Sequence, residues 1–204
     1  MIPAGLFERT KQMIHQDESA LRQAMELIEG KRREAGSVIA ALEGGAASGK
    51  TTLANQIADR LHCPVIPMDD FFLPPALRTE TRLAEIGGNI DYLRFNAQVA
   101  EPLRKGRPVS YDVYDCHREQ MTESRVIAPC QVILVEGVYS LHPLYRDAYN
   151  LRLFLRTSPE TQDARLRERG EWLYRRFQEV WLPLEKAYFD SENWESCCDA
   201  VIET

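Results

Sequence analysis

A run of small residues followed by a lysine and two threonines stands early in the chain, where residues 43–52 read E-G-G-A-A-S-G-K-T-T. Gly44, Gly49, Lys50 and Thr51 match the phosphate-binding loop pattern, in which backbone N–H groups surround a phosphate chain. Glycine and alanine let the backbone approach the anion, lysine reaches the β- and γ-phosphates, and the threonine hydroxyl can ligate Mg²⁺. We therefore expect ATP and Mg²⁺ as cofactors. The residues expected to hold the phosphates are Gly44, Gly45, Ala46, Ala47, Ser48, Gly49, Lys50, Thr51 and Thr52.

Acidic residues follow two later apolar stretches. Asp69 and Asp70 come after residues 64–68, and Glu136 ends the most apolar run of the chain. In an open α/β sheet, ligands bind beyond the carboxyl ends of the strands, so acids at these ends are well placed for chemistry. One of the two aspartates could accept the proton of a hydroxyl that attacks the γ-phosphate, and the sequence leaves open which one does so. Glu136 is the expected partner of Thr51 at Mg²⁺.

A basic cluster lies late in the chain and consists of Arg165, Arg167, Arg169, Arg175 and Arg176. Two interpretations fit this cluster. In the first, the arginines form a solvated helix face and pair with neighbouring glutamates. In the second, they belong to a lid that closes over ATP and brings positive charge to the transferring phosphoryl group.

The segments that must hold these residues alternate between apolar strands and amphipathic helices. Continuous apolar runs predict buried strands at 37–42, 64–68, 131–136, 151–155 and 199–202. Helical spacing predicts helices at 6–34, 51–61, 95–104, 159–169 and 172–189, and residues 108–116 and 123–128 could pair as an antiparallel ribbon. This order predicts an α/β protein with a P-loop NTPase fold, in which helices flank a mostly parallel five-stranded sheet. We divide the chain into an N-terminal helical extension, 1–36, and a P-loop domain, 37–204, with a short lid at about 158–176.

Composition and charge narrow the class of protein. The 204 residues are 44% hydrophobic and carry a formal net charge of -6, which argues against nucleic acid as a partner. No apolar run approaches the ~20 residues that span a bilayer, and no secretory signal is recognised, so we expect no membrane partner. The five cysteines show no metal-binding spacing and suit a reduced, cytoplasmic location. A small-molecule acceptor is the expected partner, and homo-oligomer formation stays open.

Four stretches together resemble the uridine kinase and phosphoribulokinase family of P-loop kinases. They are G-G-A-A-S-G-K-T-T, M-D-D-F-F, N-I-D-Y-L-R-F and V-E-G-V-Y, in the family's order and near its spacing. The resemblance covers residues 37–204. It implies an ATP- and Mg²⁺-dependent kinase, which is a phosphotransferase with an alcohol group as acceptor. In such kinases, positioning and charge neutralisation supply most of the catalysis.

The resemblance also implies roles for single residues around the phosphates. Asp69 matches the family's catalytic base, and Glu136 matches the acid of its E-G-I segment. Arg169 matches the arginine of the lid's E-R-G. Lys50 and Arg169 are therefore expected to act with Asp69 as the catalytic groups, while Thr51 and Glu136 organise the metal.

On the acceptor side the resemblance is less complete. Asp91 matches the aspartate that touches the sugar hydroxyls in uridine kinases, Tyr114 matches a tyrosine beside the base pocket, and His117 is a third expected substrate contact. Cys116 stands where uridine kinases carry an aromatic residue, and Phe72 replaces a tyrosine. A pocket built to hydrogen-bond one base discriminates steeply against other substrates, so these changes leave the acceptor open.

Two other functions therefore stay open. One is a kinase of the same fold that acts on a vitamin precursor such as pantothenate or nicotinamide riboside, or on a sugar or glycerate. The other is a regulatory P-loop NTPase without an acceptor. A guanine-reading N-K-x-D segment would favour such a switch, and the sequence has none.

Overall fold

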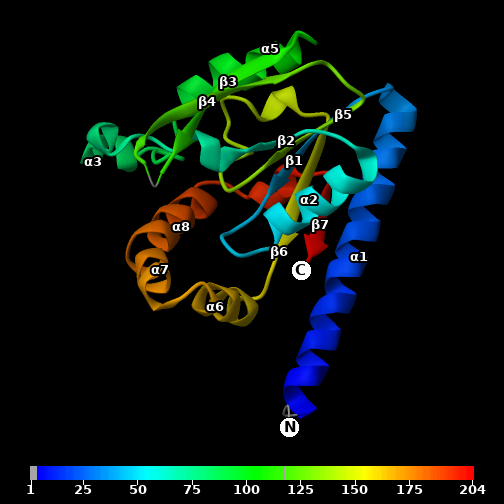
Figure 1. Cartoon of the computed structure of the whole chain (residues 1–204), viewed down its shortest axis with the longest axis vertical. Helices are drawn as coiled ribbons and strands as arrows, with labels where there is room; N and C mark the ends of the chain where they lie inside the picture. The colour runs from blue at the N-terminus through cyan, green and yellow to red at the C-terminus, as the bar shows by residue number, and fades with distance from the viewer. Residues whose placement is uncertain (1–3, 117) are drawn as a thin grey trace.

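The computed structural model describes residues 4–116 and 118–204 and contains the expected α/β sheet (Figure 1). The strands of this sheet are β1 (Val38–Glu43), β2 (Val65–Pro67), β5 (Val132–Glu136), β6 (Leu151–Arg156) and β7 (Ala200–Glu203). They lie in the order β2-β5-β1-β6-β7, and every pair is parallel. The predicted five-stranded P-loop sheet is therefore confirmed.

The central strands are apolar because both faces of the sheet are covered. All residues of β5 are buried, and its side chains alternate between two cores. Val132 and Leu134 belong to the core that α1 (Ala4–Ala35) and α2 (Lys50–Leu61) cover. Ile133 and Val135 belong to the core on the opposite face. This alternation follows from the two-residue period of a strand.

Short helices and one ribbon cover that opposite face. The helices that pack on it are α4 (Tyr92–Phe95) and α5 (Glu101–Arg104), and the ribbon consists of β3 (Val109–Asp115) and β4 (Gln120–Ile127). Helix α3 (Glu80–Leu83) has no buried residue. The ribbon is longer than predicted, since β4 begins at Gln120. Buried residues alternate along β3, whereas nearly all of β4 is exposed, so one side of the ribbon faces the core and its second strand faces solvent.

The segment that follows β6 consists of α6 (Pro159–Glu168), α7 (Glu171–Arg176) and α8 (Leu182–Asp190). A π-helical stretch, Phe177–Trp181, joins α7 to α8, and a similar stretch joins α4 to α5 at Asn96–Ala100. Pro183 and Pro102 follow these two stretches. Proline lacks the N–H that would close the preceding helical turn, which accounts for the wider turns at these places.

The N-terminal helix packs on the sheet. Ala20, Leu21, Ala24 and Ile28 of α1 are buried against the core that α2 also covers. In the described part of the chain, no helix combines the length and the apolar character that crossing a bilayer requires.

Candidate active site

The loop between β1 and α2 has the backbone that the phosphate-binding pattern predicts. Gly44 has φ +148°, and a Cβ on it would lie 2.4 Å from the carbonyl oxygen of Leu155. Gly49 has φ +89° immediately before α2 begins, and Ala47 has φ +57°. Glycine is therefore required at residue 44 by both conformation and space. A loop of this shape that leads into a helix N-terminus fits a phosphate chain.

Lys50 lies folded over this loop. Its side chain is buried, and Nζ donates hydrogen bonds to the Gly45 carbonyl oxygen at 2.7 Å and to Ser48 Oγ at 3.3 Å. Burial lowers the pKa of Lys50, and the nearby carboxylates, first among them Glu43, oppose this change. The ammonium group therefore lies against the loop backbone, and its role in binding phosphates stays a prediction.

The two predicted metal residues face one another. Thr51 Oγ1 donates to the Glu136 carboxylate, with oxygen distances of 3.1 and 3.2 Å. Burial raises the pKa of Glu136 to about 7, against the opposing effects of Lys50 and Thr51. No cluster of three or more metal-ligating side chains occurs among the described residues. Mg²⁺ usually binds one or two protein carboxylates together with phosphates and water, so Thr51 and Glu136 are residues that could hold it.

Asp69 and Asp70 follow β2 in one 3-10 turn, but their surroundings differ. The Asp69 side chain is accessible to solvent in a cleft walled by protein, and no described side chain donates a hydrogen bond to it. Desolvation raises its pKa, while Lys50 and Arg169 oppose the shift. Asp70 Oδ2, in contrast, accepts hydrogen bonds from Tyr111 and Arg125, each at 3.0 Å. Of the two acids, Asp69 is the one free to accept a proton.

Four of the five arginines in the basic cluster fall into two groups by their surroundings, and a lid over ATP stays a prediction. Arg165 donates to the Ala47 carbonyl oxygen at 3.2 Å, and the charge of Arg169 acts on both Asp69 and Glu185. Arg165 therefore contacts the phosphate loop, whereas Arg169 acts by its charge on the pKa of Asp69 and of Glu185. Arg167 and Arg175 pair with acids of their own helices, Asp163 and Glu171.

The predicted acceptor residues lie at the start of α4 and in or just after β3, and those in the described part of the chain do not form one hydrogen-bonded group. Asp91 caps α4 by accepting from the Arg94 N–H at 3.1 Å. Tyr114 is buried in β3, and its hydroxyl has no hydrogen-bond partner among the described residues. Cys116 lies near Asp69: burial and that carboxylate together raise the pKa of its thiol to about 11. His117 lies outside the described residues.

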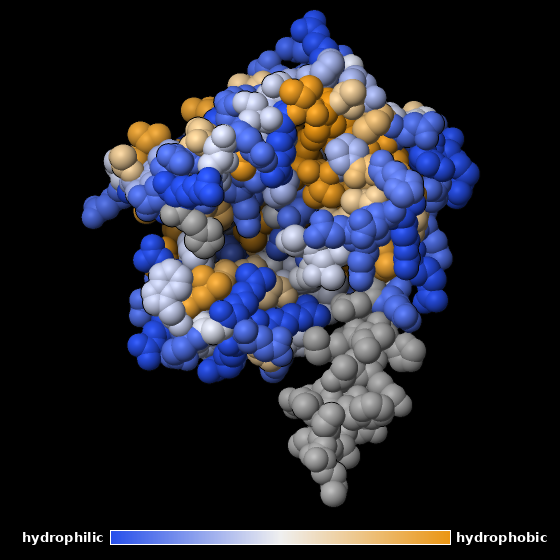
Figure 2. Space-filling view, in the orientation of Figure 1, coloured by the Kyte–Doolittle hydropathy of each residue, from blue (hydrophilic) through white to orange (hydrophobic). Residues whose placement is uncertain are grey.

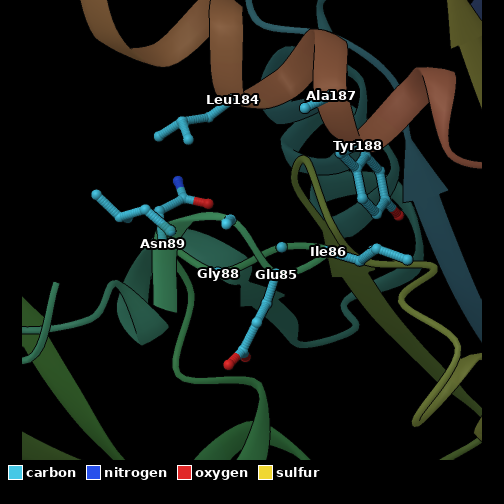
Figure 3. A pocket seen from close by; sticks show the side chains of 10 residues that line it. Glu85, Ile86, Gly88, Asn89, Leu184, Ala187 and Tyr188 are labelled. Atoms are coloured by element: carbon cyan, nitrogen blue, oxygen red, sulfur yellow. The ribbon is translucent and has the colours of Figure 1, made fainter. Parts of the chain in front are cut away.

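The cleft opens beside a small cavity. Figure 2 shows a hollow between the β3–β4 ribbon and the segment α6–α8. A cavity of about 90 Å³ lies between residues 83–89 and α8 (Figure 3). Asn89 lines it, and Figure 3 shows the Asn89 carboxamide projecting toward the helix that carries Leu184. The Asn89 Oδ1 atom is buried and accepts no hydrogen bond from the described residues.

Sequence reasoning missed Glu43, which was assigned to the loop rather than to β1. Its carboxylate is fully buried and accepts hydrogen bonds from Gly44 N at 2.9 Å, Leu141 N at 3.0 Å and the Tyr188 hydroxyl at 2.8 Å. Burial raises its pKa to about 7, against these hydrogen bonds. An acid that directly follows an apolar strand was the one signal in the sequence that could have found it.

Sequence reasoning also missed the residues from the last third of the chain that hold the loop backbone. Glu185 Oε2 accepts from Ala46 N at 2.8 Å, and Gln162 Nε2 donates to the Ala46 carbonyl oxygen at 2.9 Å. Thr204 Oγ1 donates to the Ser48 carbonyl oxygen at 2.8 Å. These contacts link residues more than one hundred positions apart, so no local pattern predicts them.

Comparisons with known proteins agree with this geometry. No family model matches the chain. Uridine kinase-like protein 5 of Arabidopsis thaliana is 33% identical over 132 residues, which is 60% of this chain and 28% of that relative. Uridine kinase-like protein 4 of the same plant is 31% identical over 157 residues, which is 72% of this chain and 32% of that relative. The chain is a relative of the uridine kinases.

A solved structure shows that this relationship extends to the fold. A possible uridine kinase from Bacillus stearothermophilus has a TM-score of 0.65 and 21% identity, covering 88% of this chain and 99% of that protein. This relative of the uridine kinases matches less than a third of the length of the two plant proteins. The fold of this chain and its relationship to the uridine kinases are therefore established.

Proposed function

We propose that this chain is an ATP- and Mg²⁺-dependent kinase that transfers the γ-phosphoryl group of ATP to a hydroxyl of a small metabolite. One observation carries the proposal: Asp69 is an unpartnered carboxylate in a cleft, and the charges of Lys50 and Arg169 act on it. A regulatory P-loop NTPase that hydrolyses ATP needs only a phosphate site and a positioned water molecule. A carboxylate without a hydrogen-bond partner, whose pKa is affected by two cations expected to bind phosphate, suits an acceptor hydroxyl that must lose its proton.

Each side chain of the site has one task in this proposal. The loop amides and Lys50 bind the phosphates, and Thr51 with Glu136 would hold Mg²⁺, which neutralises charge on the phosphate oxygens when bound. Asp69 accepts the proton of the attacking hydroxyl. Arg169 neutralises the charge that develops on the transferring group, so the chain contributes position and charge rather than covalent chemistry.

The acceptor binds, in this proposal, between Asp69 and Asp91 and below the β3–β4 ribbon. The relationship to uridine kinases favours an acceptor whose hydroxyl belongs to a sugar. The position of Cys116 favours an acceptor other than uridine, since a thiol near Asp69 stands where uridine kinases carry an aromatic residue. A vitamin precursor, a sugar or glycerate therefore remains the second group of candidates.

A coupled assay of ADP release over nucleosides, vitamin precursors, sugars and glycerate tests this proposal. We expect slow ATP turnover by the full chain alone and a large rise with one class of acceptor, because the base then has a hydroxyl to deprotonate. Rapid turnover without acceptor that stays constant across the whole panel would refute the kinase and favour the regulatory NTPase.

A further inference from the structure

Glu185 of α8 occupies an unusual place for a carboxylate. Its Oε2 atom accepts a hydrogen bond from the backbone N–H of Ala46 at 2.8 Å, and the side chain is 7% exposed. Ala46 lies within the phosphate-binding loop, whose N–H groups are the expected donors to the phosphate oxygens. A side chain from a distant helix thus bonds to one of the groups that should bind ATP.

The surroundings of Glu185 are those of a phosphate oxygen. The charged groups that act on it are Lys50, Asp69 and Arg169, which are the three side chains assigned to phosphoryl transfer. Lys50 and Arg169 attract an anion at this place, and the Ala46 N–H donates to it. A carboxylate oxygen and a phosphate oxygen are both acceptors of charge-assisted hydrogen bonds, so the same donors suit both.

A triphosphate and an ionised Glu185 cannot occupy this place together. One N–H makes one strong hydrogen bond, and two like charges about 4 Å apart repel by about 1 to 4 kcal/mol between water and a protein surface. Four acids, Glu43, Asp69, Glu136 and Glu185, already act on Lys50, so the phosphates of ATP would add to the negative charge at this place. Adding the phosphates of ATP therefore requires Glu185 to leave Ala46.

We propose that Glu185 is an internal competitor for the phosphate-binding loop, and that the triphosphate of ATP displaces it from Ala46. The proposal rests on the proposed function only in assigning ATP to the loop. Glu185 thereby lowers the affinity of the resting protein for nucleotide and ties the binding of phosphate to a movement of α8.

The packing around Ala46 shows how the displacement reaches the segment α6–α8. The Ala46 methyl group is buried in a small apolar cluster with Leu166 of α6 and Phe177 at the end of α7. Trp181, in the π-helical stretch that joins α7 to α8, packs against this cluster. Trp181 lies about one helical turn before Glu185 in the same continuous helical segment. Release of Glu185 should therefore change the environment of Trp181.

The variant Glu185→Gln tests the competition directly. Glutamine has the same shape and can still accept the Ala46 N–H through its amide oxygen, but it carries no charge to oppose a triphosphate. We expect MgATP to bind about tenfold more tightly to this variant, which corresponds to about 1.4 kcal/mol. Affinity is measured by isothermal titration calorimetry on the full chain, without any acceptor.

Glu179→Gln is the matched control. Glu179 is exposed on the same segment, so the change removes one negative charge without touching the loop. We expect its affinity for MgATP to stay within about twofold of the original chain, since exposed charges are largely screened. If both variants gain affinity equally, net charge rather than displacement explains the gain and the inference is wrong.

Tryptophan fluorescence and a second variant at residue 185 provide two further tests. Tryptophan fluorescence should change when MgATP saturates the original chain, because displacement of Glu185 moves the helix next to Trp181; an unchanged signal at saturation would count against the displacement. If Glu185→Gln does not fold, Glu185→Asp replaces it, because the shorter carboxylate withdraws from Ala46 and should also tighten binding.

The outcomes separate this inference from the proposed function. An original chain that binds MgATP as tightly as Glu185→Gln, or more tightly, overturns the competition and leaves the kinase intact. Failure of both proteins to bind MgATP removes the phosphate site, and with it the proposed function and the inference together.

Discussion

The phosphate side and the acceptor side of the cleft are built in opposite ways. On the phosphate side, three consecutive loop carbonyl oxygens, those of Ala46, Ala47 and Ser48, each accept a hydrogen bond from a side chain of the last third of the chain. On the acceptor side, the buried polar atoms Asn89 Oδ1 and Tyr114 Oη have no partner among the described residues. Side chains that are distant in sequence therefore hold the phosphate loop in place. On the acceptor side, buried polar atoms lack hydrogen-bond partners among the described residues.

This difference indicates which part of the site is complete without its ligand. A buried polar group without a partner costs free energy, so most native structures pair such groups with protein, water or a ligand. Phosphate binding uses a preformed backbone, and its geometry is common to all P-loop proteins. The acceptor side is expected to gain its missing hydrogen bonds from the substrate, so its chemistry is specific to this chain.

The largest effect is expected from Asp69→Asn, which removes the base that serves both sides of the cleft. Transfer should fall about 10²- to 10⁴-fold, the range that general base catalysis contributes. Binding of MgATP should be retained, since Asp69 makes no hydrogen bond to the loop. Measured kcat and nucleotide affinity check both parts. Burial raises the pKa of Asp69, so in the original chain kcat/KM should fall on acidification at a higher pH than for an ordinary aspartate.

Asp70→Asn is the control for that prediction, because it alters the neighbouring acid that Tyr111 and Arg125 already engage. Its effect on kcat should be at least tenfold smaller, since an acid held by two donors is a poor base. Equal losses in the two variants would remove the assignment of Asp69.

Lys50→Ala should have the next largest effect, and on the phosphate side alone. Loss of a charge-assisted hydrogen bond costs about 1.5 to 3 kcal/mol, so MgATP affinity should fall about tenfold to a hundredfold and transfer should fall with it. Lys186→Ala, which removes an exposed lysine paired with Asp190, should change neither. Unchanged nucleotide affinity in Lys50→Ala would show that Lys50 does not bind the phosphates and would contradict the distinction between the phosphate side and the acceptor side.

Glu43→Gln should weaken the fold beneath the phosphate loop. Each Glu43 oxygen accepts a backbone N–H, from Gly44 or Leu141, and the NH₂ group of glutamine can accept neither. The free energy of unfolding at pH 5 should fall by about 2 kcal/mol, the cost of an unpaired buried donor. Denaturation by urea measures it, with the exposed Glu26→Gln as a control that changes little.

The loss in Glu43→Gln should also depend on pH. The pKa of Glu43 rises from 4.5 to about 7 on folding, so the folded state binds the proton more tightly than the unfolded state. The corresponding stability is present below pH 4.5 and is lost as pH rises through 7. The difference between the original chain and the variant should therefore be larger at pH 5 than at pH 8. A difference that is constant with pH would show that Glu43 is ionised throughout.

The smallest effect is expected from Tyr114→Phe on the acceptor side. The Tyr114 hydroxyl has no described partner, so its removal should change the free energy of unfolding by less than about 1 kcal/mol. If the acceptor supplies the missing hydrogen bond, KM for the acceptor should rise several-fold while nucleotide affinity stays constant. A marked loss of stability would instead show that the hydroxyl already serves the fold.

Local patterns predict the elements of this protein well, because the signals involved lie within a few residues. The apolar runs that became β1 and β5 need burial on both faces, and the loop residues Gly44 and Gly49 need positive φ. Thr51 and Glu136 could be matched from the sequence because parallel strands bring their carboxyl ends to one edge of the sheet. Fold, phosphate loop and candidate metal pair were therefore within reach of the sequence alone.

Tertiary structure decided the remaining features. Asp69 and Asp70 are adjacent and chemically identical, and only the positions of Tyr111 and Arg125 on the ribbon show which acid stays free. Glu185 reaches the loop across 139 residues. The sequence determined which backbone can hold a phosphate, since that depends on local φ angles and small side chains. Packing determined which charges surround it, since a carboxylate's role depends on neighbours that the chain brings together only on folding.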